Sequence, residues 1–415
     1  MSSFTDLGVP ADLVAVLSKG GITAPFPIQE LTIPDLLAGR DVCGSAPTGS
    51  GKTIAFGVPL IDRVGRAKSK KPRALILAPT RELAAQIQRE LAPLADVRDR
   101  TVFTVYGGVG YEPQRRAMRR GVDVLVACPG RLEDLIAQRV VDLSMVEIVV
   151  IDEADRMADM GFLPAVRRIL DATAKERQTI LFSATLDGDV GVITRSYQRD
   201  AVRHEVPGQE SDAMDAEHRF EKIQTGDRLS RAAEVIHAEG PTIVFCRTRH
   251  GADKIAKKLG AAGVPSAPIH GGLSQGQRDR ALAAFTRGSV HALVATDVAA
   301  RGIHVDDVAC VLHFDPPTDA KTYVHRSGRT ARKGASGVVV SFVAADQMRA
   351  SRQMQRELGI GDPGEEPRPA RNGNGNGNRN RNGNGNGNGN GAQRSGRPPL
   401  RRHSQSQSRR SAGTR

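Results

Sequence analysis

The sequence predicts an α/β protein of two tandem domains, each a mostly parallel sheet with helices on both faces, followed by a disordered basic C-terminal tail. Three observations lead to this prediction. Short apolar runs alternate with helical patterns, which is typical of doubly wound parallel sheets. The alternation lapses once, around residues 203–216, and then starts again, and two domains suit a length of 415 residues. The last stretch carries almost no aliphatic side chains, so it cannot bury a core.

The strands of the first domain are predicted from runs of Val, Ile and Leu without polar alternation. A strand that is buried on both faces of a parallel sheet has no side that meets water, so such runs are expected there. Helical patterns fill the intervals, for example Arg81–Leu94 and Leu163–Thr173. The expected strands are Asp41–Ala46, Ala74–Ala78, Thr101–Tyr106, Val122–Ala127, Glu147–Ile151 and Thr179–Phe182.

A second series of strands and helices follows a polar stretch that contains Pro207 and Gly208. Its expected strands are Thr242–Phe245, Ala267–His270, Ala292–Ala295, Val308–Phe314 and Val338–Val343. Asn-Gly repeats then begin at Asn372, and such a polar repeat predicts disorder. We therefore expect a first domain over residues 1–206, a linker over 207–216, a second domain over 217–360 and a tail over 361–415.

The formal net charge of +13 points to a polyanionic partner, such as nucleic acid or an anionic membrane surface. The tail explains nearly all of it, because residues 367–415 hold 11 Arg and no acid, which leaves 48 basic and 46 acidic residues in 1–366. No apolar run approaches the roughly 20 residues of a membrane span. The N-terminus has no secretory pattern and the four cysteines lie far apart, so we expect a cytoplasmic protein with reduced thiols and no membrane contact.

A glycine-rich loop between a strand and a helix predicts a phosphate site. Small residues let backbone N–H groups close around phosphate oxygens, while the lysine reaches the β- and γ-phosphates and the last hydroxyl ligates Mg²⁺. A plain strand–helix turn is the alternative, and the sequence Gly51, Lys52, Thr53 argues against it. The loop consists of Ala46, Pro47, Thr48, Gly49, Ser50, Gly51, Lys52 and Thr53.

Catalytic partners for this loop are expected at a strand end and in the second domain. Asp152 and Glu153 follow a buried strand, so Asp152 is predicted to hold Mg²⁺, partly through water, and Glu153 to accept a proton from the attacking water. An arginine cluster at Arg326, Arg329 and Arg332 is either a surface phosphate patch or a source of arginine fingers. Because the P-loop lies in another domain, we favour fingers at Arg329 and Arg332, with ATP held between the two halves.

With Asp152, Glu153, Ala154 and Asp155 in place, the sequence resembles the DEAD-box ATP-dependent RNA helicases of helicase superfamily 2, of the bacterial type. The resemblance covers roughly residues 4–345 and implies two RecA-like domains. It also implies that Gln29, in a segment resembling the family's Q motif within residues 2–30, reads adenine, and that Phe4 packs on the base. ATP would then be the substrate. For Phe4, an ordinary hydrophobic anchor is the alternative.

The resemblance also implies residues that couple hydrolysis to RNA and residues that contact RNA. The coupling residues are Asp155, Ser183, Thr185, His325 and Arg326, although Ser183 and Thr185 also suit a helix cap. The RNA contacts would use hydroxyls, arginines and backbone N–H groups, which suit phosphates and sugars and so bind without sequence preference. They are Pro79, Thr80, Arg81, Gly107, Gly108, Pro129, Gly130, Arg131, Arg247, Thr248, Gly271, Gln275, Arg278 and Thr296.

Two positions depart from the family pattern. Cys128 stands where the family has threonine, and a thiol is a weak hydrogen-bonding group. His304 stands where the family has aspartate, so the ribose role of that aspartate is not carried over.

The implied activity is RNA-stimulated ATP hydrolysis coupled to local, non-processive unwinding of RNA duplexes or remodelling of RNA–protein complexes. An ATP-gated RNA clamp or annealing chaperone is one alternative, and a DNA helicase is a weaker one. The tail is expected to add nonspecific RNA binding, with a solubilising spacer as the alternative.

Overall fold

The computed structural model describes residues 2–46, 49–183, 186, 188–206, 216–300, 308–331, 336–360 and 368–369. Residues 1–370 form one compact unit. The predicted linker 207–216, apart from Ala216, and the predicted tail, apart from the two residues 368–369, lie outside the described residues.

The first sheet has seven parallel strands in the order β3-β4-β2-β5-β6-β1-β7. They are β1 (Val42–Ser45), β2 (Ala74–Leu77), β3 (Val102–Val105), β4 (Val124–Ala127), β5 (Ile148–Ile151), β6 (Gln178–Ser183) and β7 (Val202–Glu205). The helices are α1 (Ala11–Lys19), α2 (Pro27–Leu37), α3 (Lys52–Arg63), α4 (Arg81–Val97), α5 (Tyr111–Arg120), α6 (Pro129–Ala137), α7 (Ala154–Asp159), α8 (Leu163–Asp171) and α9 (Gly188–Tyr197).

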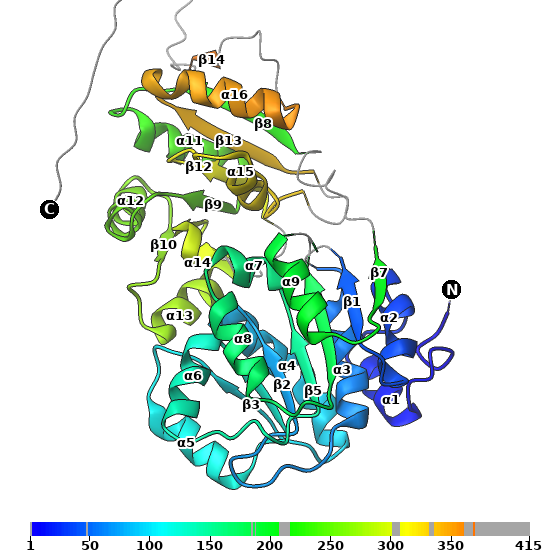
Figure 1. Cartoon of the computed structure of the whole chain (residues 1–415). Coiled ribbons are helices and arrows are strands. Elements are labelled where there is room, and N and C mark those ends of the chain that lie inside the picture. The colour runs from blue at the N-terminus through cyan, green and yellow to red at the C-terminus, as the bar shows by residue number, and fades with distance from the viewer. Residues whose placement is uncertain are drawn as a thin grey trace, which may run out of the picture. The chain divides into compact units, whose positions relative to one another are not determined.

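Helices cover both faces of this sheet, and the strand sequences explain why (Figure 1). Ala74 and Ile76 of β2 join one core with side chains of α1–α4, while Leu75 and Leu77 join a second core with side chains of α5–α9. Successive strand residues point to opposite faces, so a strand that is apolar throughout supplies both cores.

The second sheet repeats this topology, with the order β10-β11-β9-β12-β13-β8-β14. Its strands are β8 (Glu217–Lys222), β9 (Thr242–Phe245), β10 (Ser266–Ile269), β11 (Ala292–Ala295), β12 (Cys310–His313), β13 (Val338–Val343) and β14 (Arg368–Pro369). Its helices are α11 (Arg228–Glu239), α12 (Arg249–Ala261), α13 (Gln275–Thr286), α14 (Asp297–Ala300), α15 (Ala320–Ser327) and α16 (Met348–Leu358), with a short 3₁₀ turn, η1 (Ala345–Gln347). The predicted fold class is thereby confirmed.

Every strand predicted from an apolar run is present, with ends shifted by at most two residues. The strands β7, β8 and β14 were not predicted. Half or more of the residues in Val202–Glu205 and Glu217–Lys222 are charged, and β14 is a two-residue strand within the segment that was predicted to be a disordered tail. Both pair beside the central strands, β7 with β1 and β8 with β13.

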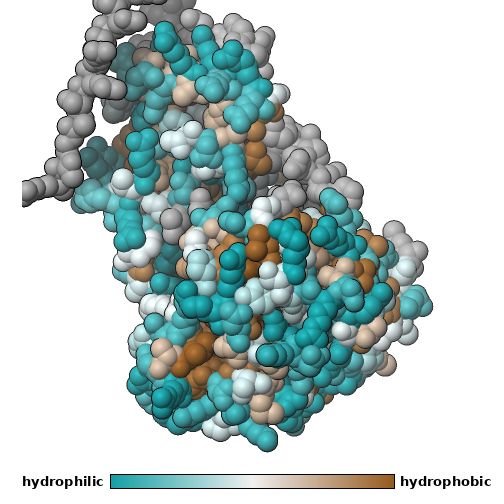
Figure 2. Space-filling model, in the orientation of Figure 1, coloured by the Kyte–Doolittle hydropathy of each residue, from teal (hydrophilic) through white to brown (hydrophobic). Residues whose placement is uncertain are grey.

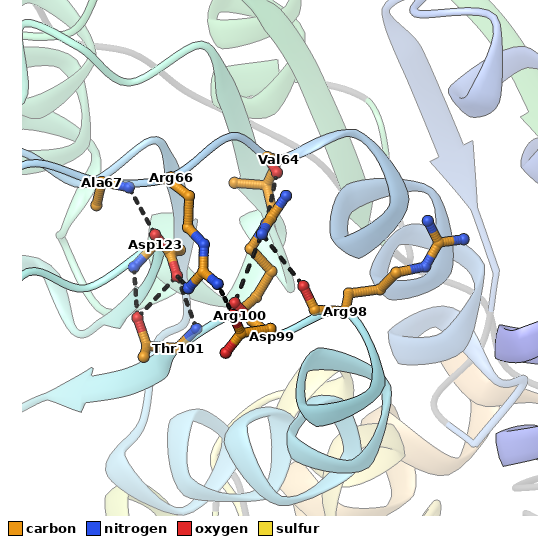
Figure 3. A network of polar contacts seen from close by, with 8 residues as sticks. All are labelled: Val64, Arg66, Ala67, Arg98, Asp99, Arg100, Thr101 and Asp123. Atoms are coloured by element: carbon orange, nitrogen blue, oxygen red, sulfur yellow. Dashed lines mark hydrogen bonds and ion pairs between the residues drawn. The ribbon is translucent and has the colours of Figure 1, made fainter.

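The amino ends of the first sheet are joined by a polar network around Asp123, just before β4 (Figure 3). The Asp123 carboxylate is 3% exposed and accepts hydrogen bonds from the backbone N–H of Ala67 at 2.6 Å and of Thr101 at 2.8 Å. It also accepts one from the Thr101 hydroxyl at 3.0 Å. Three chain segments that enter the sheet are therefore fixed by one buried acid.

The visible face of the molecule is mostly hydrophilic, with apolar surface confined to separate small areas (Figure 2). Among the described residues, no helix has the length and apolar character to cross a membrane.

Candidate functional site

The predicted phosphate loop leads from β1 into α3, as its sequence requires. Gly49 and Gly51 have φ near +86° and +85°, which glycine adopts without strain. The Lys52 ammonium donates a hydrogen bond to the Ala46 carbonyl at 2.8 Å, so it lies back over the loop. Ser50 and Thr53 are described at the start of α3, while Pro47 and Thr48 lie outside the described residues.

Gln29 packs against this loop. Its side chain is 1% exposed, accepts a hydrogen bond from the Phe26 backbone N–H at 2.9 Å and donates one to the Gly51 carbonyl at 2.9 Å. An amide has two N–H donors and two acceptor lone pairs, so one donor and one lone pair remain for a ligand. A side chain at Gly51 would collide with Gln29 and with the Phe26 ring, which shows how closely α2 meets the loop.

Two aromatic residues near this loop have opposite surroundings. Phe4 is 2% exposed and belongs to the core with Leu13, Leu17 and Ile28, as the hydrophobic-anchor alternative expects; its contact with a base stays a prediction. Phe26 is 50% exposed beside the phosphate loop. Sequence analysis did not single out Phe26, although an aromatic residue just before an N-terminal helix proline is an unusual choice for an exposed position.

Asp152 and Glu153 lie at the carboxyl end of β5, both less than one tenth exposed. Burial raises the pKa of Asp152 to about 7, with the negative charges of Glu153 and Asp155 adding to the rise and the positive charge of Lys52 opposing it. Glu153 begins α7 with φ of +52°, a left-handed conformation that costs a residue with a side chain about 1 kcal/mol. A strained, buried acid pair marks a site that the surrounding fold has to hold in place.

The Glu153 carboxylate accepts a hydrogen bond from Arg156, one turn along α7, at 2.6 Å. Both side chains are 11% exposed. Two other nitrogens of the Arg156 guanidinium, Nε and Nη2, are buried without a hydrogen-bond partner in the described part of the chain. The sequence analysis missed Arg156, because only the structure shows that it faces Glu153.

A pocket joins the acid pair to the second half of the chain. It is lined by Lys52, Glu153 and Asp155 from the first half and by His325, Arg326 and Arg329 from the second. Residues that lie more than 270 positions apart in the sequence thus share one pocket, as the sequence led us to expect for Arg329. Arg332 lies outside the described residues.

Arg326 is held within its own half. Its guanidinium donates two hydrogen bonds to Asp297, at 2.6 and 2.8 Å, and one to the Asp315 carbonyl at 2.8 Å. It also lies 5.0 Å from the centre of the Phe245 ring. With every guanidinium nitrogen bonded, Arg326 is suited to position α15, and through it Arg329, rather than to reach a ligand.

Asp155 and Ser183, two of the coupling residues that the resemblance implied, are in contact. The Ser183 hydroxyl accepts a hydrogen bond from the backbone N–H of Asp155 at 3.2 Å. This contact connects β6 to the first turn of α7, and the coupling role of the two residues stays a prediction. Thr185 lies outside the described residues.

Many of the predicted RNA-contacting residues line a second pocket. It is lined in the first half by residues after β2, β3 and β4, and in the second half by residues after β10 and on α13. The carboxyl ends of strands form the ligand edge of open α/β sheets. The predicted residues that line it are Pro79, Thr80, Arg81, Gly107, Gly130, Arg131, Gly271 and Arg278.

Two arginines of this pocket lie against the loop between β3 and α5. Arg131 donates to the Val109 carbonyl at 3.1 Å and lies 3.9 Å from the centre of the Tyr111 ring, so it supports the glycine loop before α5. A side chain at Gly108 would collide with the Arg81 guanidinium. Glycine at 108 therefore leaves room for an arginine at the pocket wall.

Arg278 forms an ion pair between the two halves. Its Nε donates to Glu82 Oε1 at 2.7 Å, and both side chains are less than one tenth exposed. Gln275 also reaches Glu82, at 3.4 Å. Sequence analysis assigned Arg278 and Gln275 to RNA and did not foresee their contact with Glu82.

The remaining predicted RNA residues have local structural contacts. Thr80 and Thr248 cap α4 and α12 by accepting hydrogen bonds from Leu83 and Gly251. Arg247 is exposed, and its backbone N–H donates a hydrogen bond to the Asp315 carboxylate at 2.9 Å. Thr296 follows β11 and is buried. Pro129 begins α6. Their roles toward RNA stay predictions.

Cys128 is the N-cap residue that precedes α6, and it lines the same pocket as Arg131. Burial raises the pKa of its thiol to about 12, so the thiol is neutral at pH 7. Its side chain makes no capping hydrogen bond, unlike the hydroxyls of Thr80 and Thr248. His304, the other departure from the family pattern, lies outside the described residues.

Two similar parallel sheets, a P-loop with a strand-end acid pair and an arginine-bearing second half define a two-domain, P-loop nucleotide-binding protein. Comparison with known proteins is more specific. Residues 26–191 match the DEAD/DEAH box helicase family and residues 221–334 match the helicase conserved C-terminal domain. The chain belongs to the DEAD-box ATP-dependent RNA helicase family.

Individual relatives agree with this assignment. The chain is 38% identical over 350 residues to the ATP-dependent RNA helicase CshA of Listeria monocytogenes, covering 84% of this chain and 67% of the relative. It is 40% identical to the chloroplastic DEAD-box ATP-dependent RNA helicase 3A of Zea mays, covering 85% of this chain and 49% of the relative. For several plant relatives, the chain spans only 49–60% of their length.

A solved structure shares the fold across both domains. Dbp5 of Saccharomyces cerevisiae, bound to RNA and ADP BeF3, superposes with a TM-score of 0.76 at 29% identity. The match covers 87% of this chain and 95% of that chain.

Proposed function

We propose that this protein is an ATP-dependent RNA helicase that hydrolyses ATP between its two halves and opens short RNA duplexes. The observation that carries the proposal is the shared pocket, in which Lys52 and Glu153 of the first half meet Arg329 of the second. A solved relative bound to RNA and ADP BeF3 supports both ligands.

The adenine of ATP is assigned to Gln29. Its remaining N–H and lone pair suit N7 and N6 of adenine, the donor and acceptor pair that an amide recognises on this base. The exposed Phe26 ring beside the phosphate loop is a suitable stacking surface for the same base. The phosphates are assigned to residues 46–53, including Ala46, Gly49, Ser50 and Gly51, at the N-terminus of α3.

Thr53 and Asp152 would hold Mg²⁺. The donors fit the ion, since a buried carboxylate that shares its surroundings with Glu153 and Asp155 is stabilised by a divalent cation. When bound, Mg²⁺ neutralises charge on the phosphates. Among the described residues, no three acidic, His or Cys side chains form a metal cluster, which suits an ion that takes most of its ligands from phosphate and water.

In the hydrolysis step, water oxygen attacks the γ-phosphorus and the bond to the β–γ bridging oxygen breaks. Glu153 accepts the proton of the water, and Arg329 and Arg332 are assigned to the charge that develops on the transferred group. Lys52 serves the β- and γ-phosphates. The ion pair with Arg156 keeps the Glu153 carboxylate oriented at the pocket before water is bound.

RNA is assigned to the second pocket. Its lining of glycines, hydroxyls and arginines suits the sugar–phosphate backbone, so binding is largely independent of sequence. Ion pairs between the halves support coupling, because Glu82–Arg278 and Asp159–Lys321 form only when the halves meet. If ATP and RNA both favour that state, each raises the affinity for the other.

The test is duplex unwinding by the full-length protein. We expect ATP hydrolysis that RNA stimulates, and ATP-dependent opening of a short RNA duplex but not of the matching DNA duplex. Opening of DNA alone would support the DNA helicase alternative, and RNA binding without ATP turnover would support the clamp. Cytoplasmic location and RNA binding by the tail stay predictions.

A further inference from the structure

Two strongly basic runs in the sequence belong to none of the helicase motifs. Residues 66–73 contain five Lys or Arg and no acid, and residues 115–120 contain four Arg and no acid. Outside the tail the chain carries a net charge of only +2, so such runs are a local excess and not the average of the surface. Clusters of this kind are a common footprint of nucleic-acid binding.

The structure brings both runs to one place. The backbone N–H of Lys70 donates to the Met118 carbonyl in α5 at 2.7 Å, and Gly121, just after α5, lies against the carbonyl of Lys68. On the other side, the backbone N–H of Asp142 donates to the Lys70 carbonyl at 2.9 Å, and the Lys70 ammonium reaches the Arg139 carbonyl at 3.5 Å. The loop 66–73 is therefore held between the end of α5 and the segment 139–144.

Some of these cations have carboxylate partners. Lys71 pairs with Asp142 at 2.9 Å, Arg119 pairs with Glu112 at 2.7 Å, Arg73 pairs with Glu147, and Arg66 pairs with Asp99. The half-buried Arg115 donates to the Gln138 side chain and forms no ion pair. Within the described ranges, five exposed cations of this region also form no ion pair with a carboxylate. We call them the amino-edge cluster: Lys68, Lys70, Arg116, Arg120 and Arg139.

Local structure explains only part of this cluster. Positive charge in the last turn of a helix is favourable, which accounts for Arg120 at the end of α5. Arg116 lies one turn before Arg120, whose like charge opposes it, and one turn after Glu112, whose carboxylate attracts it. Lys70 and Arg139 have φ of +64° and +56°, so these two cations occupy strained turns that glycine or asparagine would suit better.

The cluster lies at the opposite edge of the sheet from the RNA pocket. Residues 66–73 lead into β2 and residues 115–121 precede β4, so both runs lie at the amino ends of the strands. The RNA-contacting residues follow the carboxyl ends of the same strands. Four-residue strands separate the two edges by about 13 Å, so the pocket and the cluster are distinct surfaces of the first half.

We propose that the amino-edge cluster is a second RNA-binding surface, which takes the phosphate backbone of the part of a long RNA that lies outside the helicase pocket. The inference rests on the proposed RNA function and extends it. Exposed lysines and arginines without acid partners attract phosphates and release their counterions, whatever the base sequence. Such a surface would hold a structured RNA near the pocket while ATP-driven opening and release continue.

The experiment compares two fourfold variants of the full-length protein. One replaces the cluster (Lys68→Gln, Lys70→Gln, Arg116→Gln, Arg120→Gln). The control replaces four exposed cations elsewhere in the first half that also have no carboxylate partner among the described residues (Lys19→Gln, Arg89→Gln, Arg167→Gln, Lys175→Gln). Both keep the tail, so its contribution is the same.

Each protein is titrated with a single-stranded RNA of about ten nucleotides, the size that one binding site covers, and with a long hairpin that carries a single-stranded extension. We expect the cluster variant to bind the hairpin about 10-fold more weakly, with a salt slope shallower by about three for four lost contacts. Short-RNA affinity and RNA-stimulated ATP hydrolysis should stay within twofold of wild type, and the control should match wild type throughout.

Equal hairpin affinity and salt slope in the two variants would overturn the proposal and leave an acidic protein as the partner to seek. Photocrosslinking from a 4-thiouridine-labelled hairpin stem to wild-type protein gives a test that needs no variant, because crosslinks should fall within residues 66–73 or 115–120. Crosslinks confined to the pocket would also overturn it. Absent stimulation of wild-type ATPase by the short RNA would instead refute the proposed function, so the two failures are distinguishable.

Discussion

Buried carboxylates occur at both edges of the first sheet, and their hydrogen bonds differ. At the amino edge, Asp41 accepts hydrogen bonds from the backbone N–H groups of Thr179 and Arg199, both at 2.7 Å. Asp123 accepts three, two from backbone N–H groups and one from a hydroxyl (Figure 3). At the carboxyl edge, Asp152 accepts one among the described residues, from the N–H of its own neighbour Glu153.

The difference teaches how to separate structural acids from functional ones. A carboxylate that accepts several hydrogen bonds from backbone donors of other chain segments stabilises the fold. A carboxylate that is equally buried but poorly bonded is costly unless a ligand completes its surroundings. Glu153 and Asp155, the neighbours of Asp152 in the acid motif, line a pocket that also contains Lys52 and Arg329.

The largest expected effect is on ATP turnover, which depends on the acids at the carboxyl edge of the sheet. We predict that Glu153→Gln lowers kcat for RNA-stimulated ATP hydrolysis by about 10²–10⁴-fold, because the amide cannot accept the proton of the attacking water. The amide oxygen of Gln can still accept the hydrogen bond from Arg156, so the variant should fold, with a lower unfolding temperature because the buried Arg156 loses its counter-charge. Steady-state hydrolysis at wild-type rate would remove Glu153 from the role of general base.

The next effect tests the amino edge. Asp123→Ala leaves the N–H groups of Ala67 and Thr101 without acceptors, so we predict a loss of about 3 kcal/mol in the free energy of unfolding. Denaturant titration measures it, with Asp96→Ala on the exposed end of α4 as the control, expected within about 0.5 kcal/mol of wild type. Equal stability of the two variants would contradict the structural role that we infer for the buried acids of the amino edge.

A third effect depends on pH. Since the pKa of Asp152 is raised to about 7 from its ordinary value near 3.8, the folded state binds a proton that the unfolded state has lost between these pH values. The contribution of Asp152 to the free energy of unfolding is therefore largest at about pH 4 and below, and it falls as the pH rises to 7. Without Mg²⁺ or nucleotide, Asp152→Asn should gain on the order of 2 kcal/mol over wild type at pH 8 and nothing near pH 4.

The matched variant for this prediction is Asp41→Asn. Burial also raises the pKa of Asp41, whereas the hydrogen bonds from the two backbone N–H groups lower it. In the Asn variant the side-chain NH₂ group would face one of these N–H donors, so that hydrogen bond would be lost. Asp41→Asn should therefore lose stability at pH 8, where Asp152→Asn gains it. Unfolding curves of both variants at pH 5 and 8 decide this, and a pH-independent offset for Asp152→Asn would contradict the prediction.

The smallest effect concerns an acid that bonds across the two halves. We predict a coupling of about 1–3 kcal/mol between Glu82 and Arg278, from a double-mutant cycle of Glu82→Gln and Arg278→Gln read out as kcat/KM of RNA-stimulated hydrolysis. The pair is buried, so breaking it leaves a charge without a partner. Additive effects of the two substitutions would show that the contact does not assist closure.

Much of the fold was predictable because the information is local. Strands such as Ala74–Leu77 are apolar throughout, and the glycine-rich loop, the acid pair and the threonine caps are short contiguous patterns. The strands β7 and β8 were not predictable, because half of their residues are charged and their pairing with β1 and β13 is set by tertiary contacts.

The site was predictable in its parts and less so in its contacts. Glu82 and Arg278 are separated by 196 residues, so their ion pair follows from how the two halves meet and not from either motif. Phe4 lies in the core, as the hydrophobic-anchor alternative expects, and its contact with the base stays a prediction. The exposure of Phe26 beside Gly51 follows from tertiary packing and could not be read from the sequence. Arg156 likewise gained significance only from its position beside Glu153.

The most direct test of the central claim, that ATP is hydrolysed where the two halves meet, is the ATPase activity of Arg329→Ala measured with its RNA affinity. Arg329 belongs to the second half, while Lys52 and Glu153 belong to the first. We predict a loss in kcat of about 10³-fold, the usual contribution of an arginine finger, with RNA affinity within about threefold of wild type. Intact hydrolysis with weakened RNA binding would contradict the claim.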